Sequence, residues 1–434
     1  MQIKKPFQRP ELVTAEVKTT EGGGKAAKMQ GRRAFLKGVA TGALATGALT
    51  LGLSGCSGEN SSASDKDGGA EKDGSAEEDG GRQSSELRCV DVHTHMIFID
   101  PADNTAEGSQ AAADELINRM DLAGIDRVIL LAVTERLLWG EPSIPDYKPW
   151  TLDDLTKQND VCLAAHERYP DRLDVFIGLD WRGFGRNGWS NQAVEQVTRA
   201  IEESGAKGIK FHIGQATTVL HLNRALGLAD DHQFLGDDHL SPVLLKMWEL
   251  GGIPLFHVGD VPTVSYPEDA PPFWDMNAAT YQHFEQLLNK FPDRPFIVAH
   301  LGCLSPDLNP HIDIPGAPTD YTQLRTLLDN HPNLYADTAG INVVLSRIAL
   351  SEEGAQSTRQ LILDYPQRIL FGTDFGPLQK EFPAYEIYHE WLTGPFGQTF
   401  TNSYYPGLNI WSLGLEGDVL QDLYYGNYER IRGK

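Results

Sequence analysis

The sequence is poor in positive charge and in cysteine, and these two shortages limit the functions to expect. Against 60 acidic residues stand 37 lysines and arginines, so the 434-residue chain has a net charge of -23. A chain of this charge repels phosphates, which argues against nucleic acid as a partner. The cysteines form no C-x-x-C pair, so nothing favours a zinc ribbon or a thioredoxin-like site. They are Cys56, Cys89, Cys162 and Cys303.

Two further features are missing. No G-x-G-x-x-G turn follows the first strand that we expect, which weakens a Rossmann interpretation. The apolar run over residues 39–56 is too short and too rich in glycine to predict a membrane span. With 41% hydrophobic and 9% aromatic residues, the composition is nevertheless that of a globular protein.

The first 56 residues resemble a twin-arginine export signal that ends in a lipobox. Arg32 and Arg33 precede the apolar run, which closes with "LSGC" at Cys56. Cleavage there would leave Cys56 as a lipid-modified N-terminus. An uncleaved anchor or a chance arginine pair is the alternative, and Met29 is a second candidate for the start of translation.

Residues 57–86 contain glycine, serine and acidic residues without large apolar side chains. Such a segment buries too little surface to offset the entropy lost on ordering, so it predicts a disordered tether. We therefore expect an exported protein held on the extracytoplasmic side of the cell envelope. Its partners would be the twin-arginine export machinery and, through the lipid on Cys56 alone, the membrane.

From residue 87 onward, short apolar runs alternate with amphipathic segments. Alternating strands and helices imply a parallel sheet with helical crossovers. Eight such units over residues 87–434 predict a (β/α)8 TIM barrel, with large insertions after the second, fifth, sixth and eighth strands. A doubly wound open sheet is the alternative. The expected strands are 88–92, 126–133, 173–180, 206–212, 253–259, 295–302, 333–339 and 368–374.

Polar residues stand where several of these strands end, which is the end of a barrel where active sites form. Alternation along the first strand turns Val90, Val92 and Thr94 toward the helices and Asp91, His93 and His95 inward. In the same way we expect Ile297, Ala299 and Leu301 to face outward and His300 inward. The other residues expected to point inward are His257, Asp374, Lys210 and His212.

Several imidazoles and a carboxylate in one small space would be costly to bury without a cation. These ligands suit Zn²⁺ best, with iron, manganese or cobalt as alternatives. Each motif is weak alone: "HTH" occurs often by chance, and Asp374 could simply cap a helix. Their common position at strand ends is what predicts a metal site.

Two further pairs of residues have open roles. Lys210 could be a carboxylated lysine that bridges two metals, a substrate-binding cation or a partner of acidic neighbours, and His212 a second metal or substrate contact. Arg182 and Arg186 in "WRGFGR" could bind a substrate carboxylate or lie in a solvated loop. We favour one metal over two.

The segments "VDVHTHM", "GIKFH", "IPLFHVG", "FIVAHLG" and "ILFGTDFG" together resemble the amidohydrolase-related family of metal-dependent hydrolases. The resemblance runs from about Arg88 to the C-terminus. It implies that His93, His95, His257 and Asp374 bind one metal and that His300 is a catalytic histidine beside the metal-bound water. Asp374 would also accept a proton from that water.

Three functions remain open at this stage. The resemblance implies hydrolysis of an amide, ester or lactone in a small molecule, or else non-oxidative decarboxylation of a small aromatic or unsaturated acid. A lipid-tethered binding protein without catalysis is the third. A homo-oligomer is compatible with each of them.

Overall fold

The computed structural model describes residues 87–96, 105–134, 151–259, 273–302, 321–340, 349–376, 384–402 and 409–433. The export signal predicted over residues 1–56 and the tether predicted over 57–86 lie outside these ranges. So do most of the insertions expected after the second, fifth, sixth and eighth strands. Among the helices of the described residues, none combines the length and apolar character needed to cross a membrane.

Eight parallel strands follow one another around a single sheet in the order in which they occur along the chain. The predicted (β/α)8 TIM barrel is therefore confirmed, and the doubly wound alternative is wrong. The strands are β1 Val90–Thr94, β2 Arg127–Leu131, β3 Leu173–Ile177, β4 Gly208–Gly214, β5 Ile253–Val258, β6 Phe296–Val298, β7 Leu334–Asp337 and β8 Ile369–Leu370. A separate two-stranded sheet pairs β9 Thr399–Phe400 with β10 Ile410–Trp411.

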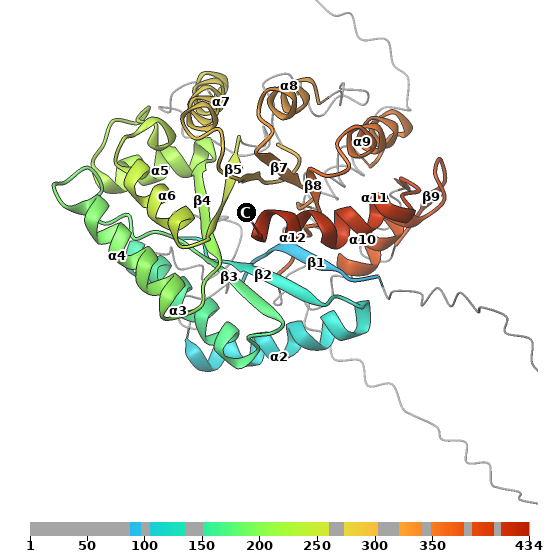
Figure 1. The fold of residues 1–434 in the computed structure, drawn as a ribbon, viewed down its shortest axis with the longest axis horizontal. Coiled ribbons are helices and arrows are strands. Elements are labelled where there is room, and N and C mark those ends of the chain that lie inside the picture. Colours follow the sequence, from blue (N-terminus) through green and yellow to red (C-terminus); the bar gives the residue numbers. More distant parts are fainter. Residues whose placement is uncertain are drawn as a thin grey trace, which may run out of the picture. The chain divides into compact units, whose positions relative to one another are not determined.

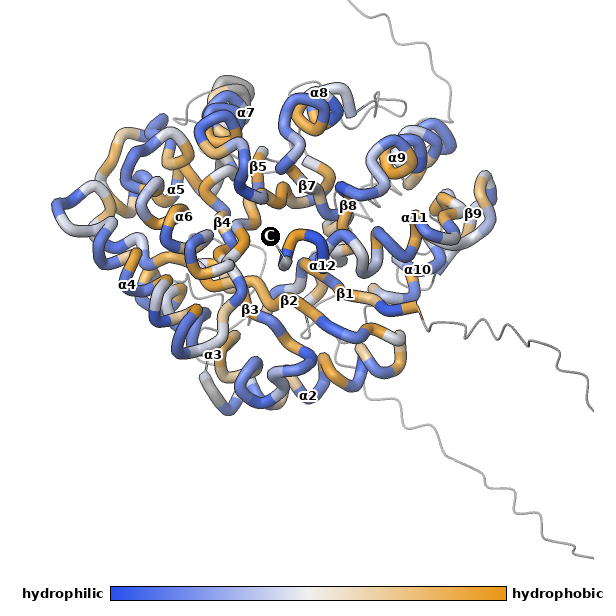
Figure 2. Tube along the Cα trace, in the orientation of Figure 1, coloured by the Kyte–Doolittle hydropathy of each residue, from blue (hydrophilic) through white to orange (hydrophobic). Residues whose placement is uncertain are grey.

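Helices surround the strands, as Figure 1 shows. They are α2 Ala106–Ala123, α3 Leu152–Arg168, α4 Trp189–Glu202, α5 Ala216–Leu226, α6 Leu240–Glu249, α7 Phe273–Lys290, α8 Thr322–Asn330, α9 Glu352–Asp364, α10 Ala384–Thr393, α11 Gly417–Gln421 and α12 Asn427–Arg432. A short 3-10 helix, η2, spans Phe234–Gly236, and a π-helical turn, η4, spans Asp422–Gly426. Figure 2 shows hydrophobic residues along much of the strands and hydrophilic residues on the outer turns of the helices.

Local sequence sets several of the helix ends. Thr151 and Asp154 form a capping box that satisfies free N–H groups at the start of α3. The side chain of Thr105 caps α2 in the same way, and Gly124 ends that helix in the left-handed conformation that glycine adopts easily. Local sequence therefore sets where these helices begin and where α2 ends.

The last strand returns to the first. The Val92 amide donates to the Phe371 carbonyl at 2.9 Å, and the Asp374 amide donates to the His93 carbonyl at 2.7 Å. A bridge between Thr94 and Phe375 lies beyond them. These bonds close the barrel at the seam between β1 and β8.

The interior of the barrel is a cluster of apolar side chains from nearly every strand. Register pairs Leu255 with Ile297 and Ile297 with Tyr335, so these three share the inner face. In the view of Figure 1, α12 crosses the middle of the ring, and its Tyr428 and Ile431 are buried in the same cluster. The C-terminal helix therefore closes the end of the barrel where the strands begin.

The expected direction of Val90 and Val92 is wrong. Both belong to the interior cluster, where the sequence had predicted contact with the helices. The reason is a β-bulge in β1: Asp91 pairs with Val128 and Thr94 with Leu130, so Val92 and His93 together oppose one residue of β2. The extra residue lets His93 point inward as predicted, although strict alternation from the inward Val92 would turn it outward.

Strand β6 departs from alternation for a different reason. Ile297 and Ala299 lie in the interior cluster, so their predicted outward direction is also wrong. His300 and Leu301 have φ values of 59° and 53°, a left-handed conformation that costs about 1–2 kcal/mol for residues other than glycine. This turn directs the His300 side chain inward beside the interior residues that precede it.

The inward direction predicted for Asp91 is also wrong. Asp91 shares the face of its register partner Val128, opposite to that of Val90. Tyr385, on α10, is close enough for the Asp91 charge to raise the pKa of its hydroxyl, an effect second to that of burial. Asp91 therefore lies within the wall on its outer side.

Candidate metal centre

His93 in β1 and His95 just after it direct their Nε2 atoms toward each other. His93 Nδ1 donates to Asp337 Oδ2 at 2.8 Å, and His95 Nδ1 donates to the Leu131 carbonyl at 3.0 Å. Because a carbonyl can only accept, His95 must carry its proton on Nδ1. In the neutral imidazoles both Nε2 atoms therefore hold lone pairs, and these two atoms are 3.2 Å apart.

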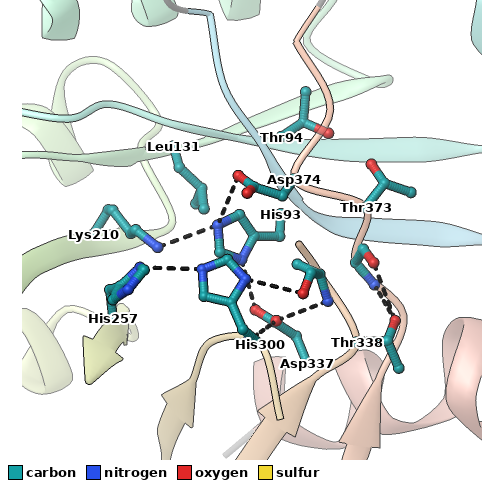
Figure 3. Close-up of polar contacts among 12 residues, drawn as sticks. His93, Thr94, Leu131, Lys210, His257, His300, Asp337, Thr338, Thr373 and Asp374 are labelled. Carbon is teal, nitrogen blue, oxygen red and sulfur yellow. Dashed lines mark hydrogen bonds and ion pairs between the residues drawn. The ribbon is translucent and has the colours of Figure 1, made fainter. Parts of the chain in front are cut away.

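A carboxylate completes this group, as Figure 3 shows in part. Asp374 Oδ1 lies 3.1 Å from His95 Nε2 and 3.6 Å from His93 Nε2. The three side chains offer ligand atoms within 4.8 Å of one another. A tetrahedral cation with ligands at ~2.1 Å needs donor atoms ~3.4 Å apart, which matches this spacing. The donor set of two imidazoles and one carboxylate fits a divalent transition metal.

Burial favours the protonation states that such a site requires. It lowers the pKa of His93 well below its ordinary value, with a further contribution from the charge of Lys210. Burial alone would raise the pKa of Asp374, but protonated rings beside it, through a hydrogen bond from His95 and the charges of His93, His95 and His300, lower it well below the ordinary range. A bound cation would supply the same positive charge beside neutral rings. A neutral imidazole and an ionised carboxylate are the forms that bind a metal.

The fourth predicted ligand lies beside the predicted catalytic residue. His300 Nδ1 donates to the Ala339 carbonyl at 2.9 Å, and its Nε2 is 3.1 Å from His257 Nδ1. Burial lowers the pKa of His300, which favours the neutral ring. His257, in β5, and His300, just after β6, therefore add two imidazoles beside the group of His93, His95 and Asp374. The role of His257 as a metal ligand stays a prediction.

Residues of β4 form another side of the site. Lys210 is fully buried, and its Nζ donates to His93 Nε2 at 3.2 Å. The predicted inward direction of Lys210 is therefore confirmed, while its carboxylation and a second metal stay predictions. His212 stacks on His257 with ring centroids 5.1 Å apart. A second bulge lies in β4 between Phe211 and Gly214, where His212 and Ile213 together oppose His257.

The two arginines after β3 have other surroundings. Arg182 forms ion pairs with Asp180 and Asp153, and its side chain is about half exposed. Arg186 is exposed. Since the guanidinium of Arg182 is already paired with two carboxylates, nothing here strengthens the prediction that it binds a substrate.

Asp337 is a further residue of this site that the predicted strand ends did not single out in the sequence. This fully buried carboxylate accepts from His93 Nδ1 through Oδ2 and from the His300 amide through Oδ1, the latter at 2.7 Å. It therefore orients a predicted ligand and a predicted catalytic residue at once. The signal was present, because Asp337 ends an apolar strand in "LYAD" just as Asp374 follows one in "ILFGTD".

Comparison with known proteins identifies the family of this chain. The amidohydrolase family model matches residues 90–431, which include every strand of the barrel. The chain belongs to the amidohydrolase family. It therefore has the barrel and the metal-binding character of that family.

Solved structures of similar fold are distant in sequence. A 4-oxalomesaconate hydratase from Rhodopseudomonas palustris is 14% identical, with a TM-score of 0.47 over 80% of this chain and 95% of that one. A 2,6-dihydroxybenzoate decarboxylase from Rhizobium is 15% identical, with a TM-score of 0.47 over 80% and 98%. A dihydroxybenzoic acid decarboxylase from Polaromonas with bound manganese is 16% identical, with a TM-score of 0.47 over 80% and 96%. No curated protein matches the chain.

We predict that Asp337→Asn weakens metal binding without unfolding the protein. Loss of the carboxylate that orients a metal-binding histidine typically costs 10–100-fold in affinity. Competition with a chromophoric chelator would measure this change. The matched control is Asp174→Asn, an equally buried carboxylate that binds Arg127 and Tyr428 where β3 begins. Equal affinity in the Asp337 variant and the unaltered protein would contradict the role of Asp337.

Proposed function

We propose that this protein is a metal-dependent hydrolase that cleaves an amide, ester or lactone bond in a small organic substrate. The observation that carries the proposal is the convergence of His93 Nε2, His95 Nε2 and Asp374 Oδ1, with both other imidazole nitrogens held by buried acceptors. Zn²⁺ is the cation we favour, because imidazole and carboxylate suit it. Three protein ligands leave room for water, as catalytic zinc sites do and closed structural sites do not, and with His257 as the fourth predicted ligand water would take a fifth position.

A divalent cation in this site would lower the pKa of a water molecule toward neutrality and polarise the bond under attack. Around it, the protein's own groups would position the reactants and move the proton. His300, held through Nδ1 by the Ala339 carbonyl and kept neutral by burial, has a lone pair on Nε2 that can accept a proton. The imidazolium so formed could then stabilise developing negative charge. Asp374 is ionised and can accept a proton from water on its second oxygen.

Non-oxidative decarboxylation is the second candidate, and Lys210 is the observation that favours it. A fully buried amine at the edge of the metal group would suit the carboxylate of an acid substrate. Incubation of the metal-loaded protein with esters, lactones, amides and aromatic acids distinguishes the two reactions. Release of carbon dioxide from an acid without hydrolysis of any ester, lactone or amide would favour the second candidate.

Metal content tests the third alternative, a lipid-tethered binding protein without catalysis. Protein purified without chelator should contain about one divalent cation per chain, and dialysis against a chelator should abolish turnover. Adding Zn²⁺, Fe²⁺, Mn²⁺ or Co²⁺ separately would then identify the metal that restores it. A protein that binds none of these cations would exclude the proposed enzyme.

We predict that His300→Ala retains the metal and loses turnover by about 10²–10⁴-fold, because it removes a positioned acid–base group. Metal content and steady-state rates would be measured on the same preparation. His166→Ala is the control, since His166 bonds the carbonyl of Leu173 where β3 begins. Unaltered turnover in His300→Ala would rule out its catalytic role.

We further propose that the protein is exported through the twin-arginine route and anchored to the cell envelope by a lipid on Cys56. Support comes from the order of the paired arginines, the apolar run, "LSGC" and the polar tether. That route carries folded proteins, which suits an enzyme that takes up its metal before export.

We predict that changing Arg32 and Arg33 together to Lys retains the protein in the cytoplasm, because the paired arginines are what the export machinery reads. Cell fractionation and immunoblotting would measure this. Cys56→Ser should leave export intact but release the protein from the membrane fraction. Normal export of the double lysine variant would contradict the signal assignment.

A further inference from the structure

Asp91 occupies the seam where the barrel closes, and the proposed chemistry leaves it without a role. It is fully buried on the outer side of the wall. Four hydrogen bonds partly offset the loss of water around its carboxylate. Burying a carboxylate costs free energy, so Asp91 is expected to do something here that a neutral side chain would not.

The hydrogen bonds of Asp91 reach both sides of the seam. Its Oδ1 accepts from the His93 amide at 3.0 Å and from the Thr373 amide at 3.1 Å. Its Oδ2 accepts from the Thr94 hydroxyl at 3.0 Å and from the Thr373 hydroxyl at 2.6 Å. Each oxygen thus accepts one bond from the β1 segment and one from the segment that follows β8.

Every residue that Asp91 holds is a candidate ligand or the neighbour of one. His93 is itself a candidate, Thr94 precedes His95, and Thr373 precedes Asp374. Consecutive Cα atoms are 3.8 Å apart, so a displacement of Thr373 moves Asp374 with it. Asp91 therefore lies behind the candidate metal group and contacts the backbone that carries it on both sides.

Regular sheet pairing is short at this seam. Strand β8 has two residues, β1 carries the bulge, and Asp374 is in the left-handed conformation with φ at 58°. The backbone bonds between the segments include Asp374 to His93 and His95 to Phe375. A rigid carboxylate that bonds both segments supplies the constraint that a longer ladder would otherwise give.

We propose that Asp91 is a positioning residue that sets the separation between the His93–His95 pair and Asp374, and with it the affinity for a divalent cation. This inference rests on the proposed metal-dependent function and deepens it, since Asp91 touches neither the cation nor the substrate.

The experiment compares Zn²⁺ dissociation constants between variants that leave every candidate ligand intact. They are measured by chelator competition on the folded full-length protein. Asp91→Asn keeps one oxygen for the two amides, but it removes the negative charge and places an NH₂ group against two hydroxyls, which must turn from donating to accepting. We expect its dissociation constant to rise roughly 10–100-fold, as for other residues that orient metal ligands. Asp174→Asn is the matched control: it should lower the thermal midpoint of the metal-free protein and leave the dissociation constant unchanged.

Thr373 supplies a second, milder test that does not depend on the Asp91 variant being stable. Thr373→Val removes the hydroxyl that donates to Asp91 and nearly keeps the side-chain volume. We expect it to weaken Zn²⁺ binding, and Thr373→Ser, which keeps the hydroxyl, to bind as the unaltered protein does. If Asp91→Asn fails to fold, this pair decides the question.

The outcomes separate the two proposals. If the unaltered protein binds none of Zn²⁺, Fe²⁺, Mn²⁺ and Co²⁺, the proposed function fails and this inference fails with it. If the unaltered protein binds Zn²⁺ but Asp91→Asn and Thr373→Val bind it equally well, only the role of Asp91 is overturned. An equal loss in Asp174→Asn would also overturn it, because the effect would then follow from lost stability alone.

Discussion

The approach of two imidazole lone pairs and one carboxylate oxygen is the constraint on which the rest of this structure depends. His93 and His95 cannot turn these nitrogens away, because their other nitrogens are held by Asp337 and by the Leu131 carbonyl. Without a cation or a proton between them, such atoms repel one another. The features around them, namely the buried acceptors, the bulge in β1 and the left-handed Asp374, serve to hold this arrangement in place.

Carboxylates outside the metal group do much of that holding. Asp337 connects β7 to the histidines of β1 and β6, and we propose that Asp91 connects β1 to the segment after β8. Both are fully buried, and burial raises the pKa of each. A barrel can bear this cost locally because its apolar interior and the closing helix α12 stabilise the fold elsewhere. Stability and chemistry are thus separated between the two ends of the barrel.

The site also explains why a single set of residues is compatible with more than one reaction. The metal group supplies charge, His300 supplies a neutral imidazole, and Lys210 adds a buried amine at His93. Fold and family therefore indicate a metal-dependent enzyme, and the two proposed reactions differ in the substrate that the site would bind.

By itself the sequence determined the order of the eight strands and helices, and the placing of His93, His95, His300 and Asp374 at strand ends, because hydrophobic periodicity and strand-end position are local properties. Alternation, however, assigned the wrong face to Val92, Asp91 and Ala299. Only the tertiary structure decided those directions, since the bulge in β1 depends on pairing with β2 and the turn at His300 on bonds to β7. The role of Asp337 was hidden for the same reason: its partners are remote in sequence and meet it only when the barrel closes.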